Sequence, residues 1–149
     1  MTELTLRPAT VDDIQRLFEW RNDPDTRKSS RNREPISLGE HKTWLLRSLS
    51  DTSRILLIAE QEEVPVGVVR ADEKSGVVEL SWTIAPEARG RGLGKSMVVQ
   101  FVRERLSGKK IRASVRKGNI PSEKIAEALG LRPTVPEENS GDPPMIVWN

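Results

Sequence analysis

A glycine-rich, basic turn lies past the middle of the chain and reads RGRGLGKS at residues 89–96. Its glycines are Gly90, Gly92 and Gly94, and its basic residues are Arg89, Arg91 and Lys95. Glycines allow a sharp turn and leave the neighbouring amides uncovered, while an apolar helical repeat from Met97 to Leu106 follows directly. Because the start of a helix attracts anions, the segment predicts a phosphate or pyrophosphate site.

Two common phosphate motifs do not fit this turn. A Walker loop needs a glycine where this chain has Arg89, although Gly94, Lys95 and Ser96 match its end. A dinucleotide fingerprint needs GxGxxG, whereas the glycines here run GxGxG, and no acidic residue ends a following strand. The spacing that remains is R-x-x-G-x-G, preceded by a strand with the sequence ELSWTI.

A second group of chemically useful residues is the basic run WRNDPDTRKSSRNREP at residues 20–35. Its cations are Arg21, Arg27, Lys28, Arg31 and Arg33. The run is either a solvated loop or short helix, as such charge runs often are, or a loop that receives an anionic substrate.

Two residues are candidates for moving a proton. Glu79 lies on the strand before the glycine turn, although a glutamate there is more often simply exposed. His41, the only histidine, titrates in a useful range, but it is equally explained by packing against Leu38, Leu45 and Trp44. Such a group is needed in amine chemistry, because a lysine-like amine is about 99.9% protonated at pH 7.

Composition limits the alternatives. The 149 residues are expected to form one domain over 1–149, and a net charge of +2 argues against nucleic-acid binding. The absence of cysteine excludes a thiol nucleophile, and no cluster of metal ligands is visible. No targeting or membrane-spanning segment is recognised, so a cytoplasmic protein without a membrane partner is expected, as a monomer or homodimer.

The surrounding elements follow from apolar periodicity. Strands are expected at 3–7, 54–60, 64–71, 79–84, 111–115 and 145–148. Helices are expected after Thr10, after the capping box of Ser37 and Glu40, between the glycine turn and Gly108, and between Pro121 and Gly130. The proline-rich tail from Thr134 to Ser140 is expected to form neither. This order predicts an α+β fold with a sheet covered by helices.

The R-x-x-G-x-G turn and its ELSW strand resemble the coenzyme A loop of the GNAT acetyltransferase superfamily. A second family segment, N-x-x-S before a helix ending in L-G, is matched by Asn119, Ser122, Leu129 and Gly130. The resemblance covers nearly the whole chain. It implies the GNAT fold, a mixed, mostly antiparallel sheet with helices on both faces, and acetyl-CoA as the co-substrate, without a metal.

The resemblance also implies a cofactor site. Pyrophosphate would be held by the turn, pantetheine would pair with the strand edge, and amides at a bulge near its end would face the acyl oxygen. These residues are Ile84, Ala85, Arg89, Gly90, Arg91, Gly92, Leu93, Gly94, Lys95, Ser96, Asn119 and Ser122. The family's usual tyrosine acid is replaced by Ala126, and the chain has no tyrosine, so Ser122 or a water would protonate the thiolate.

The N-terminal half resembles the acetyltransferases of pseudaminic acid biosynthesis, which act on the 4-amine of a UDP-linked sugar. The match rests on WRNDPDTRK and on Ile36, Ser37, Glu40, His41 and Trp44. It implies an acceptor site made by Trp20, Arg21, Asn22, Arg27, Lys28, Arg31, His41 and Trp44, with Glu79, His41 and Ser122 as catalytic residues. Two alternatives stay open: a Rim-type acetyltransferase of protein N-termini, and a coenzyme A-binding sensor without catalysis.

Overall fold

The computed structural model describes residues 3–149 and contains a mixed seven-stranded sheet with the order β1-β2-β3-β4-β5-β7-β6. The strands are β1 (Thr5–Pro8), β2 (Arg54–Gln61), β3 (Val64–Lys74), β4 (Val77–Ile84), β5 (Lys110–Arg116), β6 (Pro133–Pro136) and β7 (Met145–Trp148). All neighbouring pairs are antiparallel except β4 and β5, which are parallel. The predicted GNAT fold, with its antiparallel meander before the glycine turn, is confirmed.

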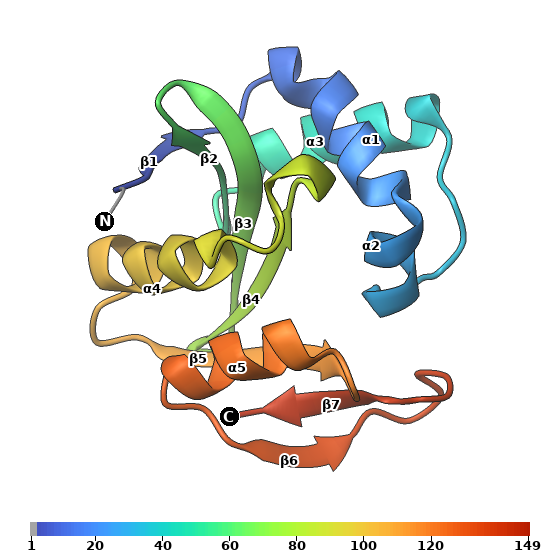
Figure 1. Cartoon of the computed structure of the whole chain (residues 1–149), viewed down its shortest axis with the longest axis vertical. Helices are drawn as coiled ribbons and strands as arrows, with labels where there is room; N and C mark the ends of the chain where they lie inside the picture. Colours follow the sequence, from blue (N-terminus) through green and yellow to red (C-terminus); the bar gives the residue numbers. More distant parts are fainter. Residues whose placement is uncertain (1–2) are drawn as a thin grey trace.

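Helices cover both faces of the sheet (Figure 1). They are α1 (Ile14–Asn22), α2 (Pro24–Ser29), α3 (Leu38–Ser50), α4 (Leu93–Arg105) and α5 (Ile120–Ala128), with short 3-10 turns at Val11–Asp13 and Pro86–Ala88. Helix α4 packs against β3 and β4, and its buried residues Met97, Val98 and Phe101 fill the core on that face. Helices α1 and α3 pack together over the opposite face.

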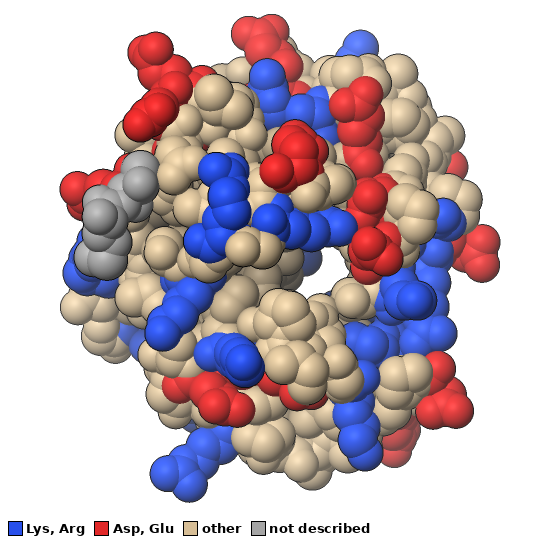
Figure 2. Space-filling view, in the orientation of Figure 1, with Lys and Arg blue, Asp and Glu red and all other residues tan. Residues whose placement is uncertain are grey.

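The sheet divides where its two parallel strands part. Strands β4 and β5 pair only from Val77–Lys110 to Leu80–Ala113. Beyond that point β4 pairs with β3 alone, through Ser81 to Ile84, and β5 pairs with β7. Figure 2 shows an opening between the part of the molecule that holds β2, β3 and β4 and the part that holds β5, β7 and α5. The edge of β4 therefore offers unpaired backbone groups on one side of an open space.

Local sequence signals explain where the helices begin. Thr10 and Asp13 form a capping box before α1, and the Ser37 hydroxyl accepts the amide of Glu40 at the start of α3, both as predicted. Asn119 caps α5 by accepting the amide of Ser122 at 3.4 Å. Each cap satisfies an amide that has no partner inside its helix, which fixes the direction in which the helix leaves the preceding strand or loop.

One segment takes a form that the sequence left open, and another differs from expectation. The basic run folds as the short helix α2, whose N-cap is Asp23 with Pro24 in the first turn. The tail expected to lack regular structure contains the edge strand β6, which pairs with β7 irregularly, through Pro133–Trp148 and Pro136–Ile146. The prediction missed β6 because its two prolines cannot donate to a ladder and read as a loop. Among the helices of residues 3–149, none is both long and apolar enough to cross a bilayer.

Candidate active site

The glycine turn places free amides at the edge of the opening. Gly90 and Gly92 adopt positive φ angles of 78° and 72°, and Gly92 is the N-cap of α4. The amide of Ser96 donates to the Gly92 carbonyl at 3.4 Å, so it is the first amide bonded inside the helix. The amides before it, from Leu93 to Lys95, have no partner inside the helix and remain available to an anion.

Gly94 allows the first turn of α4 to sit close to its neighbours. A Cβ at this position would lie 3.1 Å from Cδ1 of Ile125 on α5 and 3.3 Å from Cγ1 of Ile84 on β4. The glycine therefore brings the free amides up to the place where β4 ends and α5 begins, which is the geometry that a pyrophosphate site at the split of the sheet requires.

The arginines of the turn are already engaged. Arg89 contacts Asp23 at 3.0 Å and the Thr26 hydroxyl at 2.8 Å, both at the start of α2. Burial opposes ionisation of Asp23, but hydrogen bonds from Thr26 and Arg89 outweigh it and lower the Asp23 pKa. Arg91 donates to Gln61 at 3.3 Å, whereas Lys95 is exposed. Arg89 thus joins the turn to α2, and the helix amides offer the more direct contact for a phosphate.

The end of β4 differs from the family expectation. The register between β3 and β4 is continuous from Gly67–Ile84 to Lys74–Val77, so the bulge expected near Ile84 and Ala85 is absent. The Ala85 amide donates to the Val66 carbonyl at 2.8 Å, so the expectation that it points at an acyl oxygen is wrong for this structure. The unpaired side of β4 from Ser81 to Ile84 is the part that faces the opening.

Ser122 lies in the first turn of α5 and contacts β4 across the split. The Trp82 indole nitrogen donates to the Ser122 hydroxyl oxygen at 3.1 Å. Ala126, at the position of the family's tyrosine, is completely buried on the same helix. Ser122 is therefore the hydroxyl that α5 brings to the opening, and Trp82 is a neighbour that the sequence analysis did not identify.

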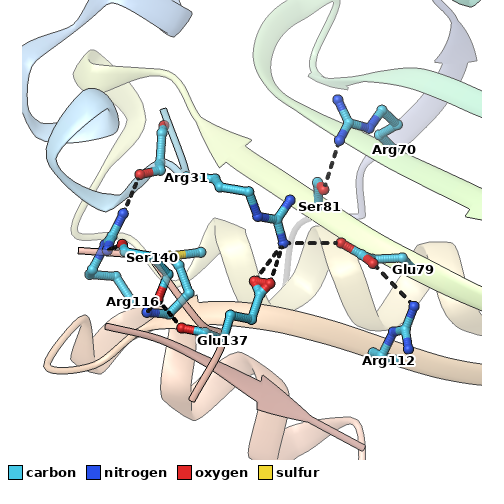
Figure 3. Close-up of polar contacts among 10 residues, drawn as sticks. Arg31, Arg70, Glu79, Ser81, Arg112, Arg116, Glu137 and Ser140 are labelled. Carbon is cyan, nitrogen blue, oxygen red and sulfur yellow. Dashed lines mark hydrogen bonds and ion pairs between the residues drawn. The ribbon is translucent and has the colours of Figure 1, made fainter. Parts of the chain in front are cut away.

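Glu79, on β4, lies between two arginines from other segments (Figure 3). Its carboxylate is 3.5 Å from Arg31, which follows α2, and 3.5 Å from Arg112 on β5. Arg31 also donates to both Glu137 oxygens, at 2.8 and 3.0 Å, just after β6. Hydrogen bonding to Glu137 is the main reason that the pKa of Arg31 is raised. Glu79 is therefore a partly exposed carboxylate, held in place by one cation from the segment after α2 and one from β5.

A cavity of about 360 Å³ lies between α1, α3 and the sheet face formed by β2, β3 and β4. Trp20, Arg21, His41 and Trp44 line it, so the structure brings these four predicted substrate residues together. Trp82, Arg70 and Ser81 also line it. Arg70 donates to the Ser81 hydroxyl at 3.3 Å, and Ser81 lies two residues from Glu79 along β4 (Figure 3). The cavity therefore opens beside the same stretch of β4 that carries Glu79.

His41 is 5% exposed and stacks on Trp44, with ring centroids 5.2 Å apart and an interplanar angle of 16°. Burial and, to a smaller extent, the charge of Arg21 lower its pKa. Within residues 3–149, neither ring nitrogen has a hydrogen-bond partner. The imidazole is therefore neutral at pH 7, and a ligand in the cavity is the natural partner for it.

The other predicted acceptor residues lie apart from this cavity. The Asn22 side chain exchanges hydrogen bonds with the backbone of Ile36, at 2.8 and 2.9 Å, and so fixes the loop before α3. Arg27 donates to the Asn22 carbonyl at 3.1 Å, and Lys28 is exposed on α2. The predicted basic cluster is thus divided: Arg21 lines the cavity, Arg31 contacts Glu79, and Arg27 and Lys28 lie on α2.

A sheet split between two parallel strands, with a glycine turn and free helix amides at the split, defines the fold and cofactor site of a GNAT acetyltransferase. The family model for the acetyltransferase (GNAT) domain matches residues 3–132, and the chain belongs to this family. It is an N-acetyltransferase, and acetyl-CoA is the acyl donor used by this family.

Solved structures show the same fold. A domain from Methanocaldococcus jannaschii has a TM-score of 0.81 and 23% identity, covering 99% of this chain and 97% of that one. Ribosomal-protein-alanine N-acetyltransferase from Brucella melitensis has a TM-score of 0.79 and 21% identity, covering 97% of both chains. The aminoglycoside acetyltransferase AAC(6')-Ib, in complex with ribostamycin and coenzyme A, has a TM-score of 0.80 and 21% identity, covering 98% and 92%. No curated protein matches the sequence significantly.

Proposed function

We propose that the protein transfers an acetyl group directly from acetyl-CoA to the primary amine of an anionic small molecule. The observation that carries this proposal is the placement of Glu79 and the cavity on one face of β4, beside the edge that the split leaves unpaired. Acetyl-CoA supplies an activated thioester, so no covalent intermediate on the protein is needed, and the chain has no cysteine to form one.

Glu79 is the proposed proton acceptor for the incoming amine. It is partly exposed, and its strand carries it beside the cavity, so an amine bound there reaches it directly or through one water. Arg31 and Arg112 hold the carboxylate in place by ion pairs at 3.5 Å. His41 is a less suitable base, because it is buried and stacked, and we assign it to acceptor binding instead.

A nucleotide-linked amino sugar is the specific acceptor that the N-terminal sequence suggests. Two features of the cavity support an anionic acceptor: the buried Nη1 atom of Arg21 and the partly buried Arg70. The same cations disfavour a polycationic acceptor of the aminoglycoside type, since like charges would be brought together at the cavity. For the donor, we propose that the amides from Leu93 to Lys95 hold the pyrophosphate and that Asn119 and Ser122 border the pantetheine arm.

The experiment is a turnover assay with acetyl-CoA and a panel of primary amines. The panel contains UDP-linked amino sugars, amino acids, aromatic amines with and without a carboxylate, aminoglycosides and peptides with free N-termini. The proposal expects anionic small amines to react with the highest kcat/KM, and Glu79→Gln to lower kcat with little effect on coenzyme A affinity. Turnover of peptides alone would instead favour an N-terminal acetyltransferase, and binding of coenzyme A without turnover of any amine would favour a sensor.

A further inference from the structure

The cavity contains a positive charge that the protein leaves without a counterion. The Arg21 Nη1 atom is buried and has no hydrogen-bond partner among residues 3–149. Its other terminal nitrogen donates only to neutral carbonyls, those of Asn32 at 3.0 Å and Glu34 at 3.4 Å. Within the same residues, Arg21 forms no ion pair with a carboxylate. Buried charges in proteins are normally paired, so the half-buried Arg21, with one buried nitrogen that has no partner, is suited to an anion from outside the chain.

The second cation of the cavity, Arg70, has a carboxylate partner, which it shares with another arginine. Arg70 forms an ion pair with Asp72 at 3.0 Å, and Asp72 also pairs with Arg54. Glu40, the carboxylate among the lining residues, is exposed and accepts a hydrogen bond from Ser37 at 3.1 Å. Of the two lining arginines, Arg21 is therefore the one without a carboxylate partner among residues 3–149, and one guanidinium suits an acceptor with a single carboxylate.

The rest of the lining suits a flat ring. The chain has 4 tryptophans: Trp20 and Trp44 line this cavity, and Trp82 borders it from β4 with its indole nitrogen bonded to Ser122. His41 stacks on Trp44 and presents one donor and one acceptor as a neutral imidazole. A volume of about 360 Å³ is at the small end of ligand pockets and holds one ring system with its substituents, not a whole nucleotide sugar.

We infer that this cavity binds a carboxylate carried on a flat ring at the non-reacting end of the acceptor, with Arg21 as the counterion. The inference rests on the proposed function, because the amine of the same molecule is taken to point toward Glu79. Ser81 lines the cavity and lies on the same face of β4 as Glu79, about 7 Å along the strand. The amine of a ring bound in the cavity is therefore expected to lie on the Ser81 side, from which Glu79 is the next residue on that face of the strand.

The test compares two acceptors that differ only in charge, 4-(aminomethyl)benzoate and 4-(aminomethyl)benzamide. The wild-type enzyme is expected to favour the benzoate in kcat/KM by about 10-fold or more, the usual size of a hydrogen bond to a charged group. Arg21→Gln should abolish this preference, and Arg21→Lys should keep part of it. The control is Arg47→Gln, which removes an exposed arginine of α3 outside the cavity and should leave the preference intact.

Binding is measured separately from turnover, by quenching of tryptophan fluorescence with 4-methylbenzoate, which has no amine. The cavity site is supported if 4-methylbenzoate quenches the fluorescence of the wild type and of Arg47→Gln but not that of Arg21→Gln. This result would support the site even if no amine is acetylated and the proposed function fails. If both amines are turned over equally and 4-methylbenzoate causes no quenching, the inference is overturned, whereas the proposed acetyltransferase activity is not. Displacement of 4-methylbenzoate by UDP at lower concentration would also overturn it, in favour of a nucleotide ring. Thermal unfolding of each variant checks that the loop held by Arg21 is intact.

Discussion

Trp82 donates its indole hydrogen to the Ser122 hydroxyl oxygen at 3.1 Å, from β4 to α5 across the split of the sheet. A hydroxyl that accepts a hydrogen bond in this way keeps its own hydrogen for another acceptor. Because the split is the proposed path of the pantetheine arm, we propose that this acceptor is the sulfur of the leaving thiolate. Trp82 then acts as a positioning residue, and Ser122 takes the place of the family's tyrosine as hydrogen donor.

Ser122→Ala is therefore expected to lower kcat by about 100-fold, the low end of what acid catalysis contributes. Trp82→Phe should lower kcat by a smaller factor, because it leaves the hydroxyl in place without its orienting donor. The measurement is single-turnover acetylation of a saturating amine, with coenzyme A affinity determined by calorimetry. If chemistry limits the rate and Ser122→Ala reacts as fast as the wild type, Ser122 has no part in protonation.

Ala126→Tyr, which would restore the family's residue, is expected to destabilise the protein. The Ala126 side chain is completely buried, so a phenol there must displace its neighbours, which typically costs about 1–3 kcal/mol. Chemical denaturation measures the loss, and Ala128→Tyr, near the exposed end of the same helix, is the control. A variant that is as stable as the wild type and turns over faster would show that the opening accommodates the ring.

Gly92→Val is expected to weaken coenzyme A binding strongly. Gly92 has a φ of 72°, which costs a side-chain-bearing residue about 1–2 kcal/mol, and it caps the helix whose free amides are the proposed phosphate ligands. Calorimetry with coenzyme A measures the affinity, and Gly39→Ala, at an open site in α3, is the control. If a folded Gly92→Val protein bound coenzyme A with wild-type affinity, the assignment of the turn to the cofactor site would be wrong.

His41 makes stability depend on pH. Because burial lowers its pKa, the unfolded chain binds a proton near its ordinary pKa of about 6.5 while the folded protein does not. The contribution of His41 to the free energy of unfolding is therefore fully present above this pH. It is lost as the pH falls toward the lower pKa that His41 has in the folded protein. Urea unfolding between about pH 7.5 and 5.5 should show a steeper loss for the wild type than for His41→Gln. Parallel curves would mean that burial does not suppress protonation of this ring.

Sequence patterns predicted the fold well, because strand alternation, capping residues and glycine stops are local signals. Thr10 and Asp13, Ser37 and Glu40, and the turn before α4 all lie where their types indicated. The acceptor side was harder to predict, since it depends on contacts between distant residues. The basic run gave no sign that Arg31 would meet Glu137, 106 residues away, or that Asn22 would bind the Ile36 backbone.

Two site residues were missed for an identifiable reason. Arg70 and Trp82 lie on strands whose apolar runs looked like core, yet a single arginine in the run VPVGVVRA is a signal of a buried polar function. Trp82 gave no such signal, because a tryptophan on a strand usually packs inside. Only the divergence of β4 from β5 makes it a neighbour of Ser122.

Arg116, buried at 4% exposure near the end of β5, has a consequence for the order in which the protein assembles. Its guanidinium donates to the carbonyls of Ser140 and Pro143 and, at 2.6 Å, to that of Ser30, 86 residues earlier in the chain (Figure 3). During synthesis, the segment after α2 emerges long before the residues that hold it. Contacts of such long range close late in folding. The segment that carries Arg31 is therefore expected to gain its contacts with Arg116 and Glu137 only when the C-terminal hairpin has docked.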